Sequence, residues 1–472
     1  MAVNQAPHIS LIRHSHFDQF MITNYIQVML NKKKILLLFI RNLFLLISIP
    51  FYLQAEVIIG SLNAESGAVS KIAGIIIEAQ RVTVDHINAD NIGIHGEGLL
   101  KIERADTGCD PIQSINTVKA FISRYNPQII LGPTCSSTTL EIAKNITIPE
   151  NILLLSSSAS SPDVSLLDDN NLVFRTIASD TQQGFSLAHY LISIKEKEAV
   201  ILYGDDRYNE TLTQIFEQEY TKAGGTIHYK TQLTNQTIID WAFINGFIDL
   251  GLTHEQPVLI MLLHGNERTG RLLEQFVGIV EERLKALTDD KIFSHHYGTD
   301  SMLTSNIRNL LYSFSPTGYH EDFTIIAQAS SQSSPEFQSY ANILLNAGID
   351  PNSPWAALSF DTTMLAALAL QHYSYKSDKN KNITLADSLF NIANPPGIIV
   401  GPGSWESARS LILRGVDINY NGVSGPLDFD SKGDVARLYS LNKVSDENTW
   451  LVNPMDPTNP AFNFIKPKLV ID

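Results

Sequence analysis

Short apolar runs recur along the chain, and most of them end in small or polar residues. Seven such runs occupy residues 57–67, 99–110, 128–137, 151–161, 199–210, 257–267 and 323–330. Apolar runs as continuous as these are typical of strands that are buried on both faces of a parallel sheet. The pattern therefore predicts a series of buried parallel strands.

The segments between several of these runs have helical spacing, with apolar residues three and four positions apart. They are residues 68–90, 109–126, 179–197 and 207–225. The last segment ends in two glycines, Gly224 and Gly225, as expected for a helix C-terminus. Strands and helices that alternate in this way form βαβ units with right-handed crossovers, so the predicted fold class is α/β with parallel sheets.

The predicted carboxyl ends of the strands are rich in polar side chains. They carry the sequences NAESG, GPTCSSTT, SSSASSPD, GDDRY, HGNE and TDSM. Ligands of open α/β sheets bind at these ends. Hydroxyls and the backbone N–H groups of helix N-termini can hold a carboxylate, and a side chain such as Asp300 can hold an ammonium group. We therefore expect a site for a small zwitterion.

The first 55 residues follow a different pattern. Lys32, Lys33 and Lys34 precede a long apolar stretch that is interrupted at Pro50 and ends at Ala55. This order predicts a secretory signal peptide that is cleaved after Ala55. A membrane anchor is the alternative, because the apolar stretch is long.

Composition and charge narrow the range of partners. The chain has 472 residues, 44% of them hydrophobic, which is enough for two domains with their own cores. The formal net charge is −15, and it becomes −19 once the five basic and one acidic residues of positions 1–55 are removed. An acidic exported protein repels nucleic acids and anionic membranes. We expect a monomer that binds a small solute or a protein partner, without a cofactor or a metal.

The chain has only two cysteines, Cys109 and Cys135. In an exported protein an even number of cysteines indicates a disulfide. The bond would close a loop of about 25 residues and stabilise the fold by roughly 3 kcal/mol. A free catalytic thiol is the alternative, but an oxidising compartment would tend to cap it.

Other motifs that could carry chemistry are incomplete. The stretch GPTCSS lacks the glycine that a G-x-S-x-G nucleophile turn requires, and no spacing places a histidine beside Cys135 or Ser136. The pair His295 and His296 lacks the spacing of a metal motif, and the two side chains would point to opposite faces of a strand. We therefore expect a protein that is not an enzyme.

Two neighbouring acids, Asp205 and Asp206, precede Tyr208 in the sequence GDDRY. They could form a carboxylate pair for acid–base catalysis. The simpler interpretation is that they cap the helix that begins near Arg207, where the helix dipole favours negative charge.

Four longer segments carry a family signature. They are ADTGCDPIQSINTVKAFISRYNPQIILGPTCSSTT, LLLSSSASSPDVSLLDDNNLVFRTIASDTQQG, VILYGDDRYNETLTQIFEQEYTKAGGTI and SGPLDFDSKGDV. In order and spacing they resemble the type I periplasmic solute-binding proteins, in particular the leucine/isoleucine/valine-binding group of ABC transporters. The resemblance runs over most of residues 56–450. It implies two Rossmann-like lobes joined by a three-segment hinge, with a ligand held between them by closure.

The resemblance also implies a division of the chain and a set of site residues. The expected parts are an extension with the signal peptide (1–55), lobe 1 (56–177 and 331–422), lobe 2 (178–330 and 423–452) and a C-terminal tail (453–472). The matching positions are Cys109 and Cys135 for the family's disulfide, Ser136 for the serine that holds the ligand's carboxylate, Ser158, Ala159 and Ser160 for the next binding turn, Tyr208 for the tyrosine that covers the ligand, and Asp300 for the acid that binds its α-amino group.

The sequence departs from the family at three places. Ile72 stands where the first loop of the family often has an aromatic residue, and Gly265 or Asn266 replaces a second aromatic residue. A preference for branched side chains is therefore not carried over. Residues 276–296 are longer than the family pattern, and we expect an added helix there on lobe 2.

The resemblance implies an exported periplasmic protein that delivers an amino acid, or a related compound, to an ABC permease in the inner membrane. The alternative is a periplasmic sensor that uses the same closure of the lobes to signal.

Overall fold

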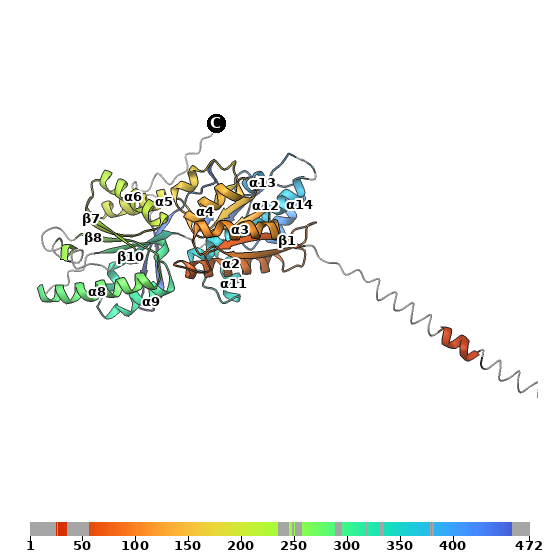
Figure 1. Cartoon of the computed structure of the whole chain (residues 1–472), viewed down its shortest axis with the longest axis horizontal. Helices are drawn as coiled ribbons and strands as arrows, with labels where there is room; N and C mark the ends of the chain where they lie inside the picture. The colour runs from red at the N-terminus through yellow and green to blue at the C-terminus, as the bar shows by residue number, and fades with distance from the viewer. Residues whose placement is uncertain are drawn as a thin grey trace, which may run out of the picture. The chain divides into compact units, whose positions relative to one another are not determined.

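The computed structural model describes residues 25, 27–34, 56–234, 245–247, 250, 257–287, 295–317, 319–329, 335–377, 379 and 382–455. Two compact units are formed, Met1–Gln54 and Ala55–Asp472. In the first unit, residues 27–34 are helical and exposed, whereas the apolar stretch and the predicted cleavage site at Ala55 lie outside the described residues. Among the described helices, none is both long and apolar enough to span a membrane. The sheets of the described residues all belong to the second unit (Figure 1).

A five-stranded parallel sheet forms lobe 1, in the order β2-β1-β3-β4-β5. Its strands are β1 (Glu56–Asn63), β2 (Leu99–Asp106), β3 (Ile129–Leu131), β4 (Leu153–Ser156) and β5 (Val173–Arg175). Every residue of β3 and β4 is buried, because helices cover both faces of the sheet. This burial explains why these strands are continuous apolar runs in the sequence.

The helices of lobe 1 come from two separate parts of the chain. They are α2 (Ser70–Ile87), α3 (Pro111–Tyr125), α4 (Ser136–Ile142), α11 (Pro335–Asn346), α12 (Pro354–Ser377), α13 (Leu385–Ala393) and α14 (Trp405–Leu413). Helix α12 is buried without interruption from Trp355 to His372, and it packs against α2, α13 and α14. A small sheet of β11 (Ile398–Val400), β12 (Ile418–Gly422) and β13 (Gly425–Pro426) completes the lobe.

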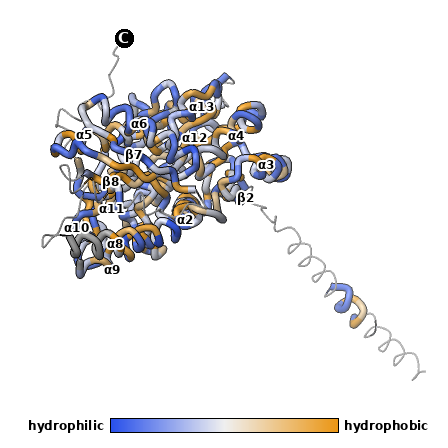
Figure 2. Tube along the Cα trace, turned by 60° about the vertical axis from the view of Figure 1, so that its left-hand side comes forward, coloured by the Kyte–Doolittle hydropathy of each residue, from blue (hydrophilic) through white to orange (hydrophobic). Residues whose placement is uncertain are grey.

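A seven-stranded sheet forms lobe 2, in the order β15-β14-β10-β9-β8-β6-β7. The strands are β6 (Glu198–Gly204), β7 (Thr226–Leu233), β8 (Val258–Leu262), β9 (His296–Thr299), β10 (Phe323–Gln328), β14 (Tyr439–Val444) and β15 (Trp450–Pro454). The first five are parallel to one another, β14 is antiparallel to its neighbour β10, and β15 is antiparallel to β14. Figure 2 shows the apolar strand β8 in the interior.

Helices cover both faces of the second sheet as well. Helices α5 (Asp180–Ser193) and α6 (Arg207–Lys222) cover one face, and α8 (Glu267–Leu287) and α9 (Ser305–Ser313) cover the other (Figure 1). A short helix, α10 (Tyr319–Asp322), precedes β10. The α/β class that the alternating pattern predicts is confirmed in both lobes.

The chain passes between the two sheets three times: from β5 to α5, from β10 to α11, and between β13 and β14. The side chains of Val423, Leu427, Phe429 and Val435 pack in the core of lobe 1. We therefore propose that the third crossover lies after Val435, and not at residue 423 as expected from the sequence. The other predicted boundaries stay predictions.

Within the described residues, the helix that we expected in residues 276–296 is found as the C-terminal part of α8. Residues 276–287 are the continuation of α8, residues 288–294 lie outside the described part, and β9 begins at His296. The apolar spacing of α8 continues through Leu273, Phe276 and Val277, which pack in the core of lobe 2. The described part of this segment is therefore helical, and that it is an addition to the family pattern stays a prediction.

Candidate ligand-binding site

A cavity of about 300 Å³ lies among the loops that follow the strands of both sheets. Its lobe 1 residues come from the loops after β1, β2, β3 and β4, and from the start of α12. Its lobe 2 residues come from the end of β7 and the loops after β6, β8 and β9. The cavity therefore lies at the carboxyl ends of the strands, where the sequence predicted a site.

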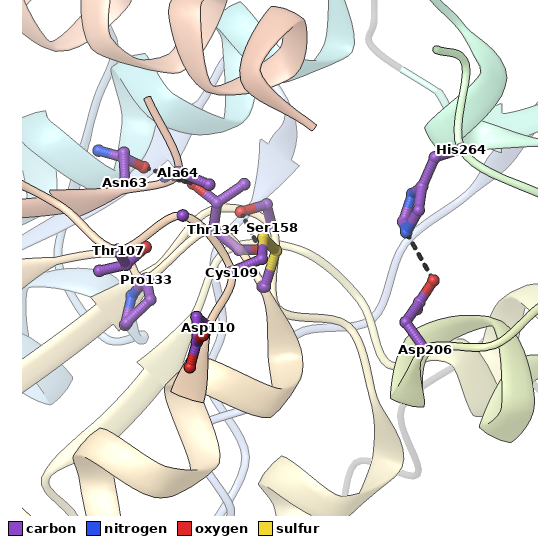
Figure 3. The surroundings of a disulfide bond; sticks show 12 residues. Asn63, Ala64, Thr107, Cys109, Asp110, Pro133, Thr134, Ser158, Asp206 and His264 are labelled. Carbon is purple, nitrogen blue, oxygen red and sulfur yellow. Dashed lines mark hydrogen bonds and ion pairs between the residues drawn. A yellow bond between two sulfur atoms is a disulfide. The ribbon is translucent and has the colours of Figure 1, made fainter. Parts of the chain in front are cut away.

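The turn between β3 and α4 forms the centre of the lobe 1 wall. Gly132 has a φ of +95°, and a Cβ added there would collide with the carbonyl oxygen of Leu62. Cys135 is the N-cap of α4, and it forms the predicted disulfide with Cys109, with a Cα–Cα distance of 5.5 Å (Figure 3). The backbone N–H groups of the first helical turn have no acceptor within the helix. They make this turn favourable for an anion.

Hydrogen bonds between the loops fix the hydroxyl groups of this wall. The Thr134 hydroxyl donates to Asn63 Oδ1 at 2.8 Å and accepts from the N–H of Ala64 at 3.2 Å. The Ser158 hydroxyl donates to the carbonyl oxygen of Thr134 at 2.9 Å (Figure 3). These bonds join the loops after β1, β3 and β4, so the wall is held in place before a ligand arrives.

The predicted lobe 1 residues divide into two groups. The Oγ of Ser136 accepts from the N–H of Ser161 at 3.2 Å, so its own proton is available to a ligand. Ala159 is fully buried; its N–H donates to Ser156 Oγ at 3.0 Å and its carbonyl oxygen accepts from Arg175 at 3.1 Å. Ala159 does not line the cavity, whereas the other three predicted lobe 1 residues do.

In lobe 2, Tyr208 lines the cavity and Asp300 lies behind it. The Tyr208 hydroxyl donates to Asp300 Oδ1 at 2.9 Å and contacts Thr299 Oγ1 at 3.1 Å. Only 4% of Asp300 is exposed. Burial raises the pKa of Asp300, although hydrogen bonds from Tyr208 and Gln183 oppose the rise. Asp300 does not line the cavity, whereas the Tyr208 side chain that is bonded to it does.

The cavity also contains an ion pair that the sequence analysis did not predict. A hydrogen bond of 3.0 Å joins Asp206 Oδ2 to His264 Nε2 across the loops after β6 and β8 (Figure 3). Burial opposes the charged form of both groups, but each stabilises the charge of the other. As a result, the pKa of Asp206 is lowered and the pKa of His264 is raised. The His264 ring stacks on Tyr208 with centroids 5.4 Å apart. The pair therefore supports the position of Tyr208.

Asp206 also accepts from the N–H of Asn209 at 3.2 Å as the N-cap of α6, which confirms the predicted cap. The other histidines considered in the sequence point apart: His295 is half exposed and bonds Glu196 at 2.7 Å, while His296 is buried and contacts Tyr319. Within the described ranges, no group of three His, Cys, Asp or Glu residues is arranged to hold a metal ion.

Comparisons with known proteins agree with this fold. The family model of the "receptor family ligand binding region" matches residues 77–447. The chemotactic signal transduction system substrate-binding protein BasB of Halobacterium salinarum is 23% identical over 399 residues, which cover 83% of this chain and 87% of BasB. The Leu/Ile/Val-binding protein of Citrobacter freundii is 26% identical over 180 residues, which cover 38% of this chain and 48% of that protein.

Among solved structures, the branched-chain amino acid transporter substrate binding protein LivJ of Streptococcus pneumoniae, in complex with isoleucine, matches with a TM-score of 0.64. The identity is 16%, and the match covers 85% of this chain and 100% of that chain. This likeness confirms the predicted fold of the type I periplasmic binding proteins.

Proposed function

We propose that this chain, which belongs to the family described as "receptor family ligand binding region", captures an amino acid or a related compound between its lobes. It would then deliver this ligand to an ABC transporter. The family and the solved neighbours are binding proteins. The observation that carries the proposal is the cavity between the two sets of strand ends, with a wall of fixed hydroxyls on the lobe 1 side.

The lobe 1 wall suits a carboxylate. The Ser136 hydroxyl has a proton to donate, and it stands at the start of α4, where backbone N–H groups also favour negative charge. Ser158 and Ser160 line the same part of the cavity. Hydrogen bonds to a charged acceptor are stronger than neutral ones, so this wall would hold the carboxylate end of the ligand.

The lobe 2 wall would receive the ammonium group. Asp300 is the acid that the family resemblance assigns to this role, and Tyr208 covers it. We propose that the Tyr208 side chain rotates when the ligand enters, so that the ammonium group replaces the tyrosine hydroxyl as the partner of Asp300. A buried carboxylate gains most from a charged partner.

Contacts between the lobes support a mechanism of closure. Arg207 at the start of α6 donates to Asp163 in lobe 1, with Nε and Oδ2 2.6 Å apart. A ligand that contacts both walls can do so only when the lobes are together. It would therefore shift the hinge equilibrium toward the closed state, and a transporter would recognise that state.

We also propose that the protein is exported to the periplasm, that it is a monomer, and that an inner-membrane permease is its partner. The lysines followed by an apolar stretch support export, with cleavage after Ala55. N-terminal sequencing of the protein recovered from the periplasmic fraction tests this directly. A first residue of Glu56 is expected, and an uncleaved N-terminus in a membrane fraction would contradict it.

A sensor that signals without transport is the second candidate, because BasB is named as part of a chemotactic signal transduction system. The two functions differ in what recognises the closed protein. If the protein serves transport, deleting its gene should abolish uptake of the labelled ligand by whole cells. Normal uptake together with a lost response to the ligand would favour the sensor.

A thermal-shift screen of the purified full-length chain against single amino acids tests ligand binding. A ligand at 100 times its dissociation constant adds about 2.7 kcal/mol of apparent stability, so a binder should raise the melting temperature clearly. Ser136→Ala should reduce the shift, whereas Ser123→Ala, an exposed serine on α3, should not. If no amino acid or small amide raised the melting temperature, the proposed function would be wrong.

A further inference from the structure

The polar side chains of the lobe 2 wall bear on the nature of the ligand's side chain. Strands β6 and β8 are neighbours, with Tyr203 paired to Leu262 near their ends. The loops that follow these strands therefore lie together, and the bond between Asp206 and His264 joins them. These loops and the start of α8 bring Asp205, Asn266 and Arg268, among others, to the cavity.

The charges on this wall balance one another. The described residues that line the cavity include two carboxylates, Asp205 and Asp206, and three cationic groups, Arg207, Arg268 and His264, while the carboxylate of Asp163 lies next to the cavity as the partner of Arg207. Asp206 is paired with His264, and Arg207 is paired with Asp163. A ligand side chain with a full charge would therefore find no net opposite charge, and it would lose its hydration on entering.

The same wall offers both a hydrogen-bond donor and an acceptor. Asn266 Oδ1 accepts from the N–H of Thr269 at 3.1 Å and so caps α8. This bond fixes the amide, and its Nδ2 donates to no other described residue. Asp205 likewise accepts no hydrogen bond from the described residues, so its carboxylate remains an acceptor. A neutral group that both accepts and donates could pair with both residues.

An aliphatic side chain would leave these groups without partners. Asp205 is exposed and Asn266 is partly buried in this structure, so water can pair with both before a ligand enters. Once a ligand displaces that water, polar groups that are left unpaired weaken binding, and a site built around hydrogen bonds rejects an analogue that lacks them. Leucines also reach this side of the cavity, at Leu233, Leu263 and Leu272. They suit the methylene groups of a side chain whose end is polar.

From this arrangement we infer that the ligand is an amino acid with a neutral, hydrogen-bonding side chain, of which a carboxamide is the best match, and not a branched aliphatic one. The inference rests on the proposed function, and it specifies the class of ligand at the same site.

Three amino acids of nearly the same shape test the inference: asparagine, leucine and aspartate. Isothermal titration of the full-length chain should show asparagine, or its longer homologue glutamine, binding at least tenfold more tightly than leucine and than aspartate. If leucine bound as tightly as the carboxamides, the inference would be overturned while the proposed function stood. If aspartate bound most tightly, the neutral wall would be refuted. If no amino acid bound, the proposed function would fail, and the inference with it.

Variants of the wall separate specificity from folding. Asn266→Leu replaces the amide by an apolar group of the same shape and should lower the ratio of asparagine to leucine affinity at least tenfold. Asp205→Asn, which changes no cap, should lower the affinity for asparagine while the melting temperature stays constant. Asn116→Leu, an exposed residue on α3, is the matched control and should change neither ratio nor affinity. An unchanged ratio in Asn266→Leu together with an unchanged affinity in Asp205→Asn would overturn the inference.

Discussion

The disulfide between Cys109 and Cys135 should serve both stability and binding. It ties the loop after β2 to the N-cap of α4, and both cysteines line the cavity. The two residues are 26 positions apart. For a loop of this length the chain-entropy relation gives a stabilisation of about 3.5 kcal/mol at 25 °C. We expect the double variant Cys109→Ser, Cys135→Ser to lose about this free energy of unfolding.

Urea denaturation of the full-length chain measures the loss. The variant should unfold at a lower midpoint, and reduction of the native protein should give the same shift. Because α4 loses its anchor, ligand affinity in native buffer should also fall about tenfold or more. A free energy of unfolding within 1 kcal/mol of the native value would refute the role of the bond in stability. An unchanged affinity would refute its role in positioning the wall.

Three further predictions concern the hinge, the pH dependence and the backbone. Arg437 is buried and donates to the carbonyl oxygen of Thr176 at 2.8 Å. Arg437→Met should lower the free energy of unfolding, measured by urea denaturation, by about 3 kcal/mol or more, because buried carbonyl groups lose their donors. Burial lowers the pKa of His296 to about 3; the unfolded chain therefore binds a proton that the folded one excludes, and stability should fall by about 1.4 kcal/mol per pH unit below about 6.5. The difference between wild type and His296→Phe across pH 4–7 measures this slope, and an equal slope in both would contradict it. Gly132→Ala should destabilise the protein by more than about 2 kcal/mol. Gly278→Ala should stabilise it by about 0.5–1 kcal/mol, because Gly278 is exposed in a helix and no atom lies near the added Cβ. Equal urea midpoints for the two variants would contradict this account.

The elements that could be predicted from the sequence are those whose burial leaves a periodic record. Strands such as β4 are buried on both faces and are therefore continuous apolar runs. Helix α6 has one buried face, an acidic N-cap at Asp206 and a glycine stop, each of which is readable locally. Helix α12 is buried all round, so it lacks the alternation of polar and apolar faces that identifies a helix, and the sequence analysis did not place it.

The candidate site could be predicted only in part, for a related reason. The strand ends that carry Ser136 and Tyr208 could be predicted to line a site because the ends of parallel strands converge, and the family resemblance then singled out these two residues. The bond between Asp206 and His264 depends on β6 and β8 being neighbours, and strand order is not visible in the apolar pattern. That Asp300 lies behind Tyr208, and that Ala159 turns into the core, follow from packing between loops.

The central claim is that one ligand is held by both lobes, and isothermal titration of three full-length proteins tests it most directly. The amino acid that gives the largest thermal shift is titrated into the wild type, into Ser136→Ala on the lobe 1 wall, and into Asp300→Asn behind the lobe 2 wall. We predict one binding site in the wild type and at least tenfold weaker binding in each variant. An affinity that stays unchanged in either variant would contradict the claim.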